Sequence, residues 1–110
     1  KKTDQFATDD SIKIFACFHQ GKVAGIIVVS FTGQHKIEIV GIAVDVPFRN
    51  KGIGSYMINC LIDDYSVKSI FAETDKDAVE FYKKNSFEIE EFAENYDGET
   101  IIRYKCKRTQ

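Results

Sequence analysis

The hydrophobic pattern of the chain changes at Gly52. Before it, KIEIVGIAV (36–44) is almost continuously apolar, which is typical of a buried strand. After it, apolar residues recur at intervals of three and four and predict an amphipathic helix; they are Ile53, Met57, Cys60, Leu61 and Tyr65. A further strand follows in KSIFAET (68–74). Strand, helix and strand in this order imply a parallel pair joined by a right-handed crossover.

The remaining segments predict a mixed sheet. SIKIFACF (11–18), VAGIIVVSF (23–31) and residues 36–44 are joined by short polar turns, which indicates an antiparallel meander. A second helix is expected in TDKDAVEFYKKN (74–85), with Thr74 or Asp75 as its cap. Asp97-Gly98 predicts a hairpin between residues 86–96 and 100–108. In it, exposed basic residues are expected to face acidic ones across the strands: Arg103, Lys105 and Lys107 opposite Glu88 and Glu90.

Composition limits the function classes. The chain has 110 residues, enough for one domain (1–110), and its formal charge of −2 argues against a general nucleic-acid binder. It has no apolar run long enough to cross a bilayer. Cys17, Cys60 and Cys106 are far apart in the sequence, so we expect free thiols, no metal site and a cytoplasmic setting. Because the only methionine is Met57, we expect a fragment or a processed form, with upstream elements missing.

The segment RNKGIG (49–54) has the features of a phosphate cradle. The N-terminus of a helix offers unpaired N–H groups and the positive end of the macrodipole. Gly52 and Gly54 keep side chains away from those groups, and Arg49 and Lys51 add positive charge. A nucleotide P-loop and a dinucleotide fingerprint both fail to match. The simpler alternative is that the glycines only let a helix follow a strand.

Two segments in their usual order resemble the GNAT superfamily of acetyl-CoA-dependent N-acyltransferases. GIAVDVPFRNKGIGSYMINCLI (41–62) is similar to its acetyl-CoA motif, and DKDAVEFYKKNSFE (75–88) to its second motif. The resemblance implies an α/β (α+β) three-layer sandwich with helices on both faces of a mixed sheet. It also implies a strand bulge at Gly41 and a parallel pair that splays apart at the cofactor site.

The same resemblance implies roles for individual residues. The pyrophosphate of coenzyme A would be held by backbone N–H groups of Arg49, Asn50, Lys51, Gly52, Ile53, Gly54 and Ser55. The pantetheine arm would pair with the strand end Ile42, Ala43 and Val44. Asp75 stands where the family often has Asn and is expected to cap the helix or contact the cofactor, and Ser86 replaces a family glycine. From the same reading, Gly54→Glu is expected to abolish coenzyme A binding and to leave the fold largely intact.

Acetyl transfer to an amine needs a base for the amine and an acid for the departing thiolate. Tyr82 is located where the family places its proton donor; the alternative is a core aromatic. Glu38 is the single carboxylate in its strand and is the candidate base; the alternative is an exposed strand position. His19 and His35 are weaker candidates. We expect direct attack of the amine on the thioester, since no cysteine stands in a nucleophile motif.

The sequence leaves the acceptor open. The family usually has a strand and two helices before the first strand predicted here, and these shape the acceptor pocket. Either these elements lie on a stretch that this chain lacks, or the domain is reduced and a partner subunit completes it, as in a homodimer. The small negative charge weakly favours a cationic acceptor, either a small molecule or a peptide. The alternative function is a non-catalytic module that binds acyl-CoA on the same fold.

Overall fold

A computed structural model describes residues 2–7 and 11–110, with side-chain surroundings given for residues 11–110. The elements are, in chain order, β1 (Lys2–Ala7), β2 (Ile12–His19), β3 (Lys22–Gly33), β4 (Lys36–Val44), the 3₁₀ helix η1 (Val46–Phe48), α1 (Ile53–Tyr65), β5 (Ser69–Thr74), α2 (Val79–Lys84), β6 (Glu88–Tyr96) and β7 (Glu99–Thr109).

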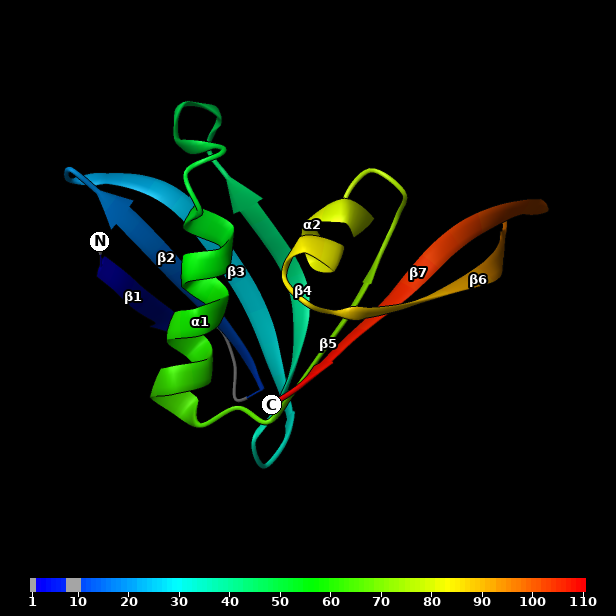
Figure 1. The fold of residues 1–110 in the computed structure, drawn as a ribbon, viewed down its shortest axis with the longest axis horizontal. Coiled ribbons are helices and arrows are strands. Elements are labelled where there is room, and N and C mark those ends of the chain that lie inside the picture. The colour runs from blue at the N-terminus through cyan, green and yellow to red at the C-terminus, as the bar shows by residue number, and fades with distance from the viewer. Residues whose placement is uncertain (1, 8–10) are drawn as a thin grey trace.

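All seven of these strands form one sheet in the order β1-β2-β3-β4-β5-β7-β6 (Figure 1). The strands β2, β3 and β4 pair antiparallel, as the predicted meander requires. The neighbours β4 and β5 pair in parallel, and α1 connects them. The predicted mixed sheet and its single parallel pair are therefore confirmed. The strand β1 was not predicted, because its residues are mostly polar; it adds antiparallel to the edge of β2.

Both helices lie on the same face of the sheet. Buried side chains of α1 and α2, such as Met57 and Tyr82, share one hydrophobic cluster with alternate strand residues, such as Ile37 and Ile39. Helices on both faces were expected, so this expectation is wrong for the described residues, which form two layers.

Strand order explains the single helical layer. The strands β5 and β6 both pair antiparallel with β7, so they run parallel to each other. The connections β4-α1-β5 and β5-α2-β6 therefore advance in the same direction across the sheet. Crossovers of the usual right hand then place both helices on one side.

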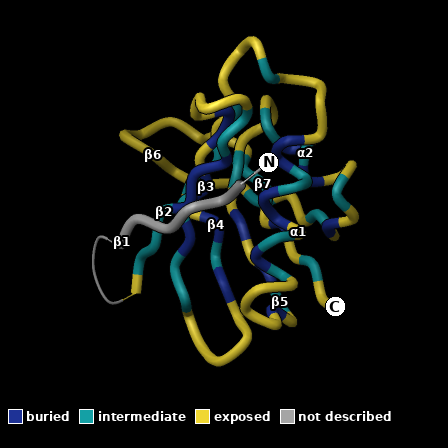
Figure 2. Tube along the Cα trace, turned by 90° about the vertical axis from the view of Figure 1, so that its left-hand side faces the viewer, coloured by how far each residue is buried: buried dark blue, intermediate teal, exposed yellow. Residues whose placement is uncertain are grey.

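The core lies between this helical layer and the centre of the sheet. Figure 2 shows buried segments in the central strands and α1, whereas β6 is largely exposed. The thiols of Cys17 and Cys106 are buried and free, and Cys60 is half-buried and free. Within the described part of the chain, no helix has the length and apolar character needed to cross a membrane.

The C-terminal hairpin follows the sequence prediction. Asp97 and Gly98 both have positive φ angles, of 51° and 78°, as a two-residue hairpin turn requires. The strand β7 pairs with β5 only from Tyr104 onward, so the far half of the hairpin extends beyond the rest of the sheet (Figure 1). Helix α2 is shorter than predicted, because the chain forms a turn over residues 76–78 before Val79.

Candidate functional site

The chain leaves β4 through a tight turn that ends at α1. Asp45 Oδ1 accepts a hydrogen bond from the Val46 N–H at 3.0 Å, and Pro47 follows at the start of η1. Arg49 Nε donates to the carbonyl oxygen of Val44 at 3.0 Å. The guanidinium is thereby held against the end of β4, next to the start of the helix.

The N-terminus of α1 begins next to unfilled space at Gly52. Gly52 is its N-cap, with a φ of +76°, and a Cβ at this position would meet nothing within 4 Å. The Tyr56 N–H donates to the carbonyl of Gly52 at 2.9 Å, which starts the helical hydrogen bonding. The N–H groups of Ile53, Gly54 and Ser55 precede this bond and have no acceptor within the helix. This end of the helix can therefore bind an anion.

A cavity of about 570 Å³ lies at this helix end. Most of the predicted pyrophosphate-binding residues line it, together with the end of β4: Val44, Arg49, Asn50, Gly52, Ile53, Gly54 and Ser55. The cavity is completed by residues that the sequence analysis did not single out: Phe48, Asp77, Phe81, Lys84 and Asn85. Four of these follow one another at intervals of four, three and one, which is the spacing of one helix face. This spacing was the signal in the sequence that could have indicated a shared surface for these four residues.

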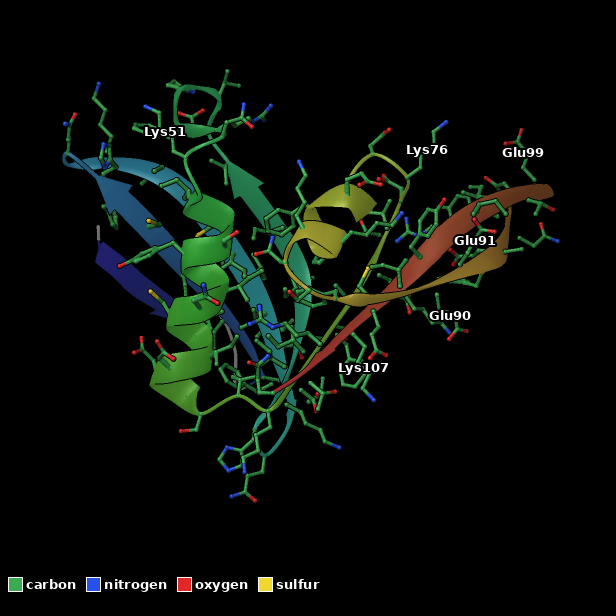
Figure 3. The ribbon with its side chains drawn as sticks, in the orientation of Figure 1. Lys51, Lys76, Glu90, Glu91, Glu99 and Lys107 are labelled. Carbon is green, nitrogen blue, oxygen red and sulfur yellow. The ribbon has the colours of Figure 1, made fainter. Side chains whose placement is uncertain are left out.

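Four predicted cofactor residues lie outside this lining: Asp75, Lys51, Ile42 and Ala43. Lys51 is exposed in the turn before α1 (Figure 3). Ile42 is half-buried and packs against the core cluster. Ala43 is exposed and lines a separate cavity of about 390 Å³ beside β3. The predicted role of this strand end in binding the cofactor therefore depends on its backbone and not on the side chains of Ile42 and Ala43.

Asp75 and Ser86 are the two residues that depart from the family's second motif, and each has an identifiable local role in the structure. Asp75 Oδ1 accepts hydrogen bonds from the N–H groups of Asp77 at 3.0 Å and Ala78 at 3.2 Å. Asp75 thus caps the turn that leads into α2, whereas the N-cap of α2 itself is Ala78, which has no side-chain cap; the predicted helix cap at Thr74 or Asp75 is therefore wrong. Ser86 has a φ of +68°, in the left-handed region that favours glycine. Ser86 therefore has the left-handed backbone conformation that would favour the family's glycine at this position.

Gly54 is required by helix packing. A Cβ on Gly54 would lie 2.7 Å from Cε1 and 2.9 Å from Cζ of Phe81 in α2. The absence of a side chain therefore lets the two helices approach each other. A glutamate here would have to displace the ring of Phe81, and the largely intact fold expected of Gly54→Glu stays a prediction.

The strands β4 and β5 separate next to this cavity. Their parallel pairing ends at Ile39 and Ala72. In the register with β3, Val29 opposes Ile39 and Val28 opposes Gly41, so Val40 is an extra, bulged residue. The predicted bulge at Gly41 is confirmed. From this point β4 remains paired with β3, whereas β5 continues beside β7, and Figure 1 shows the two strands diverging.

Tyr82 is buried on the helical side of the sheet. Its ring makes edge-to-face contacts with Phe81 and Phe87, with centroids 5.2 Å away in both cases. Burial, and to a lesser extent the neighbouring Cys106, raises the pKa of Tyr82 to about 12. The phenol is therefore neutral at physiological pH and retains a proton that it can donate.

Glu38 lies on the other, open side of the sheet. It is half-buried and pairs across the strands with Phe71, one step before β4 and β5 part. A cavity of about 400 Å³ lies here; apart from Glu38, its charged and aromatic lining consists of Phe71, Glu73, Glu88, Glu90, Lys105 and Lys107. The two catalytic candidates thus lie on opposite faces of the sheet, on either side of the strand separation.

The predicted charge ladder of the hairpin has the expected register but different contacts. Glu88 is opposite Lys107, and Glu90 is opposite Lys105. Within residues 11–110, neither lysine is in an ion pair within 4.0 Å. Their ammonium groups instead lie over aromatic rings, Lys105 over Phe92 at 5.0 Å and Lys107 over Phe71 at 5.5 Å. The third base, Arg103, has its Nε 3.8 Å from Glu94.

Comparison with known protein families identifies the fold. Residues 1–87 match the family described as the acetyltransferase (GNAT) family. The chain belongs to this family. A search of curated proteins finds no match.

Solved structures agree with the GNAT assignment. Ard1 from Thermoplasma volcanium has 28% sequence identity and a TM-score of 0.68, with 90% of this chain and 70% of that chain covered. An acetyltransferase from Bacillus subtilis in complex with CoA has 18% identity and a TM-score of 0.69, with 91% and 78% covered. A GNAT family acetyltransferase from Elizabethkingia anophelis with acetyl-CoA bound has 17% identity and a TM-score of 0.67, with 91% and 77% covered. The GNAT domain therefore has the fold of enzymes that bind coenzyme A.

Proposed function

We propose that this GNAT domain transfers the acetyl group of acetyl-CoA to a primary amine, by direct attack of the amine on the thioester. The observation that carries the proposal is the separation of β4 and β5 after Ile39 and Ala72. On the helical side of the sheet lies the open N-terminus of α1, and on the other side lies the cavity beside Glu38. Cofactor and acceptor could thus approach one opening from different sides.

The residues of the helix-end cavity fit a diphosphate. The N–H groups at the start of α1 would bind its oxygens, and the bare Gly52 leaves room for them. Arg49 and Lys84 line the cavity and supply positive charge, and Lys51 adds to it from the adjoining turn. An anion with two phosphate groups is the ligand that such donors match best.

The free edge of β4 fits the pantetheine arm. Beyond Ile39 the strand pairs with β3 on one side only, so backbone groups on the other side are available. The amides of an extended pantetheine can pair with them as an added strand does. When bound, acetyl-CoA would supply the activated acetyl group for the transfer.

The chain's own residues would move two protons. Glu38 would accept the proton that the attacking amine has to lose, from the open face of the sheet. Tyr82 would donate its phenolic proton to the departing sulfur, from the helical face. Because the pKa of Tyr82 is about 12, the donor is in its neutral form wherever the enzyme would work. The acceptor is a small-molecule or peptide amine, and a panel that contains both kinds distinguishes them.

The proposal is tested by thiol release from acetyl-CoA with a panel of primary amines, combined with calorimetric titration of coenzyme A. We expect binding, and turnover with at least one amine that falls sharply in Tyr82→Phe. The matched control is Tyr96→Phe, the same change at an exposed position near the hairpin tip. Coenzyme A binding without turnover of any amine would favour the alternative of a non-catalytic acyl-CoA-binding module. The absence of binding would contradict both.

A further inference from the structure

One row of side chains crosses four strands on the open face of the sheet. Glu38 of β4 is opposite Phe71 of β5, Phe71 is opposite Lys107 of β7, and Lys107 is opposite Glu88 of β6. All four residues line the open-face cavity. Figure 3 shows Lys107 and Glu90 on one side of the hairpin and Glu91 on the other. The row therefore places a primary amine of the chain itself in the same cavity as the candidate base, with Phe71 between them.

The ammonium of Lys107 leans toward the strand separation. Its Nζ lies 5.5 Å from the centroid of Phe71 on β5, the strand that parts from β4 one residue later. It forms no ion pair within 4.0 Å with Glu88, its partner on the outer strand, although the register places the two residues opposite each other. The attraction between a cation and the face of an aromatic ring favours this orientation.

We propose that Lys107 is an acetylation site of this enzyme, modified by the same chain on which it lies. The inference rests on the proposed function, because it uses the same donor and the same two catalytic residues. Lys107 is exposed, so its side chain is free to move toward the opening. In the absence of another acceptor, its amine occupies the place in which an acceptor amine would bind.

The step is an ordinary acyl transfer. Lys107 loses a proton to Glu38, and the nitrogen lone pair forms a C–N bond to the acetyl carbon of acetyl-CoA. The C–S bond breaks, and the sulfur receives a proton from Tyr82, so free coenzyme A leaves. The acylated nitrogen gives up its second proton, which restores the phenol of Tyr82 through water, and Glu38 releases the first proton to solvent. The product is a neutral amide, which removes one positive charge and the cation–aromatic contact from the cavity.

Lys105 is the internal control. It is two residues away on the same strand and face, and it lines the same cavity. Its Nζ lies 5.0 Å from the centroid of Phe92 on β6, and therefore on the side away from the strand separation. A reaction at the opening should modify Lys107 first, whereas chemical acetylation by acetyl-CoA should not distinguish the two lysines.

The experiment incubates the purified chain with acetyl-CoA and no added amine, and follows each lysine by peptide mass spectrometry. We expect acetylation of Lys107 ahead of Lys105, with a rate constant independent of protein concentration. Tyr82→Phe should slow modification of Lys107 by about 100-fold, the lower end of what a general acid contributes, and leave that of Lys105 unchanged. Lys107→Arg, which keeps the charge, should abolish the fast phase of modification.

Equal rates at Lys107 and Lys105, or a rate at Lys107 that Tyr82→Phe does not change, would overturn the inference. So would a rate that rises with protein concentration, because transfer would then occur between copies. The amine panel separates this inference from the proposed function. Turnover of an added amine with Lys107 unmodified would refute self-acetylation alone, whereas failure of every amine and of Lys107 would refute both.

Discussion

Gly54 of α1 lies directly against the ring of Phe81 in α2, so close that a Cβ on Gly54 would be 2.7 Å from Cε1. This contact joins the two helices that form the helix-end cavity. The glycine pair of the turn thus has two different functions. Gly52 supplies a left-handed backbone in open space, and Gly54 supplies room for a neighbouring helix.

Substitution at the two glycines should separate these functions. Gly54→Ala is expected to lower the free energy of unfolding by about 1–3 kcal/mol, because it overpacks the helix contact. Adding Phe81→Leu should recover part of this loss. Gly52→Ala should cost about 1–2 kcal/mol through its φ alone, with no recovery from Phe81→Leu. Urea unfolding of the single and double variants measures the coupling, and equal recovery in both pairs would contradict the assignment.

Removal of the Tyr82 hydroxyl should affect chemistry and spare binding. We expect Tyr82→Phe to lower turnover by about 10²- to 10⁴-fold. The dissociation constant for coenzyme A should not change, because Tyr82 does not line the helix-end cavity. Steady-state kinetics and calorimetry on the variant and on the Tyr96→Phe control provide the comparison. A parallel loss of binding and turnover would argue for a structural role.

The buried phenol should make the chain sensitive to alkali. The pKa of Tyr82 is about 12 in the folded chain and about 10 in the unfolded one, so the folded state retains the proton over this interval. Its contribution to stability is complete below about pH 10 and is lost as the pH rises through 12. Two pKa units correspond to about 2.7 kcal/mol.

Tyr82→Phe should therefore lose less stability than the parent chain between about pH 10 and 12, the interval that separates the pKa of the phenol in the unfolded chain from that in the folded chain. Urea unfolding at several pH values measures the difference. The remaining tyrosines are common to both proteins and act as the reference. Identical pH dependence of the two proteins would show that the folded chain does not raise the pKa of Tyr82.

Lys84 should contribute to coenzyme A affinity from α2. It lines the helix-end cavity, whereas its neighbour Lys83 pairs with Glu80 at 3.3 Å and does not. We expect Lys84→Gln to weaken coenzyme A binding several-fold, and the difference should shrink at high salt because exposed charges are screened. Lys83→Gln is the matched control. Equal effects of the two substitutions would indicate a general loss of charge.

Glu38 should be needed for turnover and dispensable for the cofactor. Glu38→Gln keeps the size of the side chain and removes the base, so turnover should fall by about 10²- to 10⁴-fold. Coenzyme A affinity should remain, since Glu38 lies on the other side of the sheet from the helix-end cavity. Glu91→Gln, an exposed change on the other side of the hairpin, is the control (Figure 3). Full activity of Glu38→Gln would leave a water or another residue as the base.

Local patterns in the sequence were sufficient to predict most of the helices and strands and the part of the site at the N-terminus of α1. The alternation of apolar residues identified the strands, and Asp97-Gly98 identified the hairpin, because both depend on neighbours in the chain. The change of period at Gly52 located the open helix end. The bulge at Gly41, near which β4 and β5 begin to part, was implied by the family resemblance.

Only the tertiary structure decided which of these features meet. The placement of β7 between β5 and β6 puts both helices on one face, and this brings Phe81 to Gly54. The same strand order puts Glu38 and Tyr82 on opposite faces and places Lys107 over Phe71. These contacts join residues far apart in the sequence, and strand order and register determine them. The hydrophobic period of a single segment carries no information on strand order or on register.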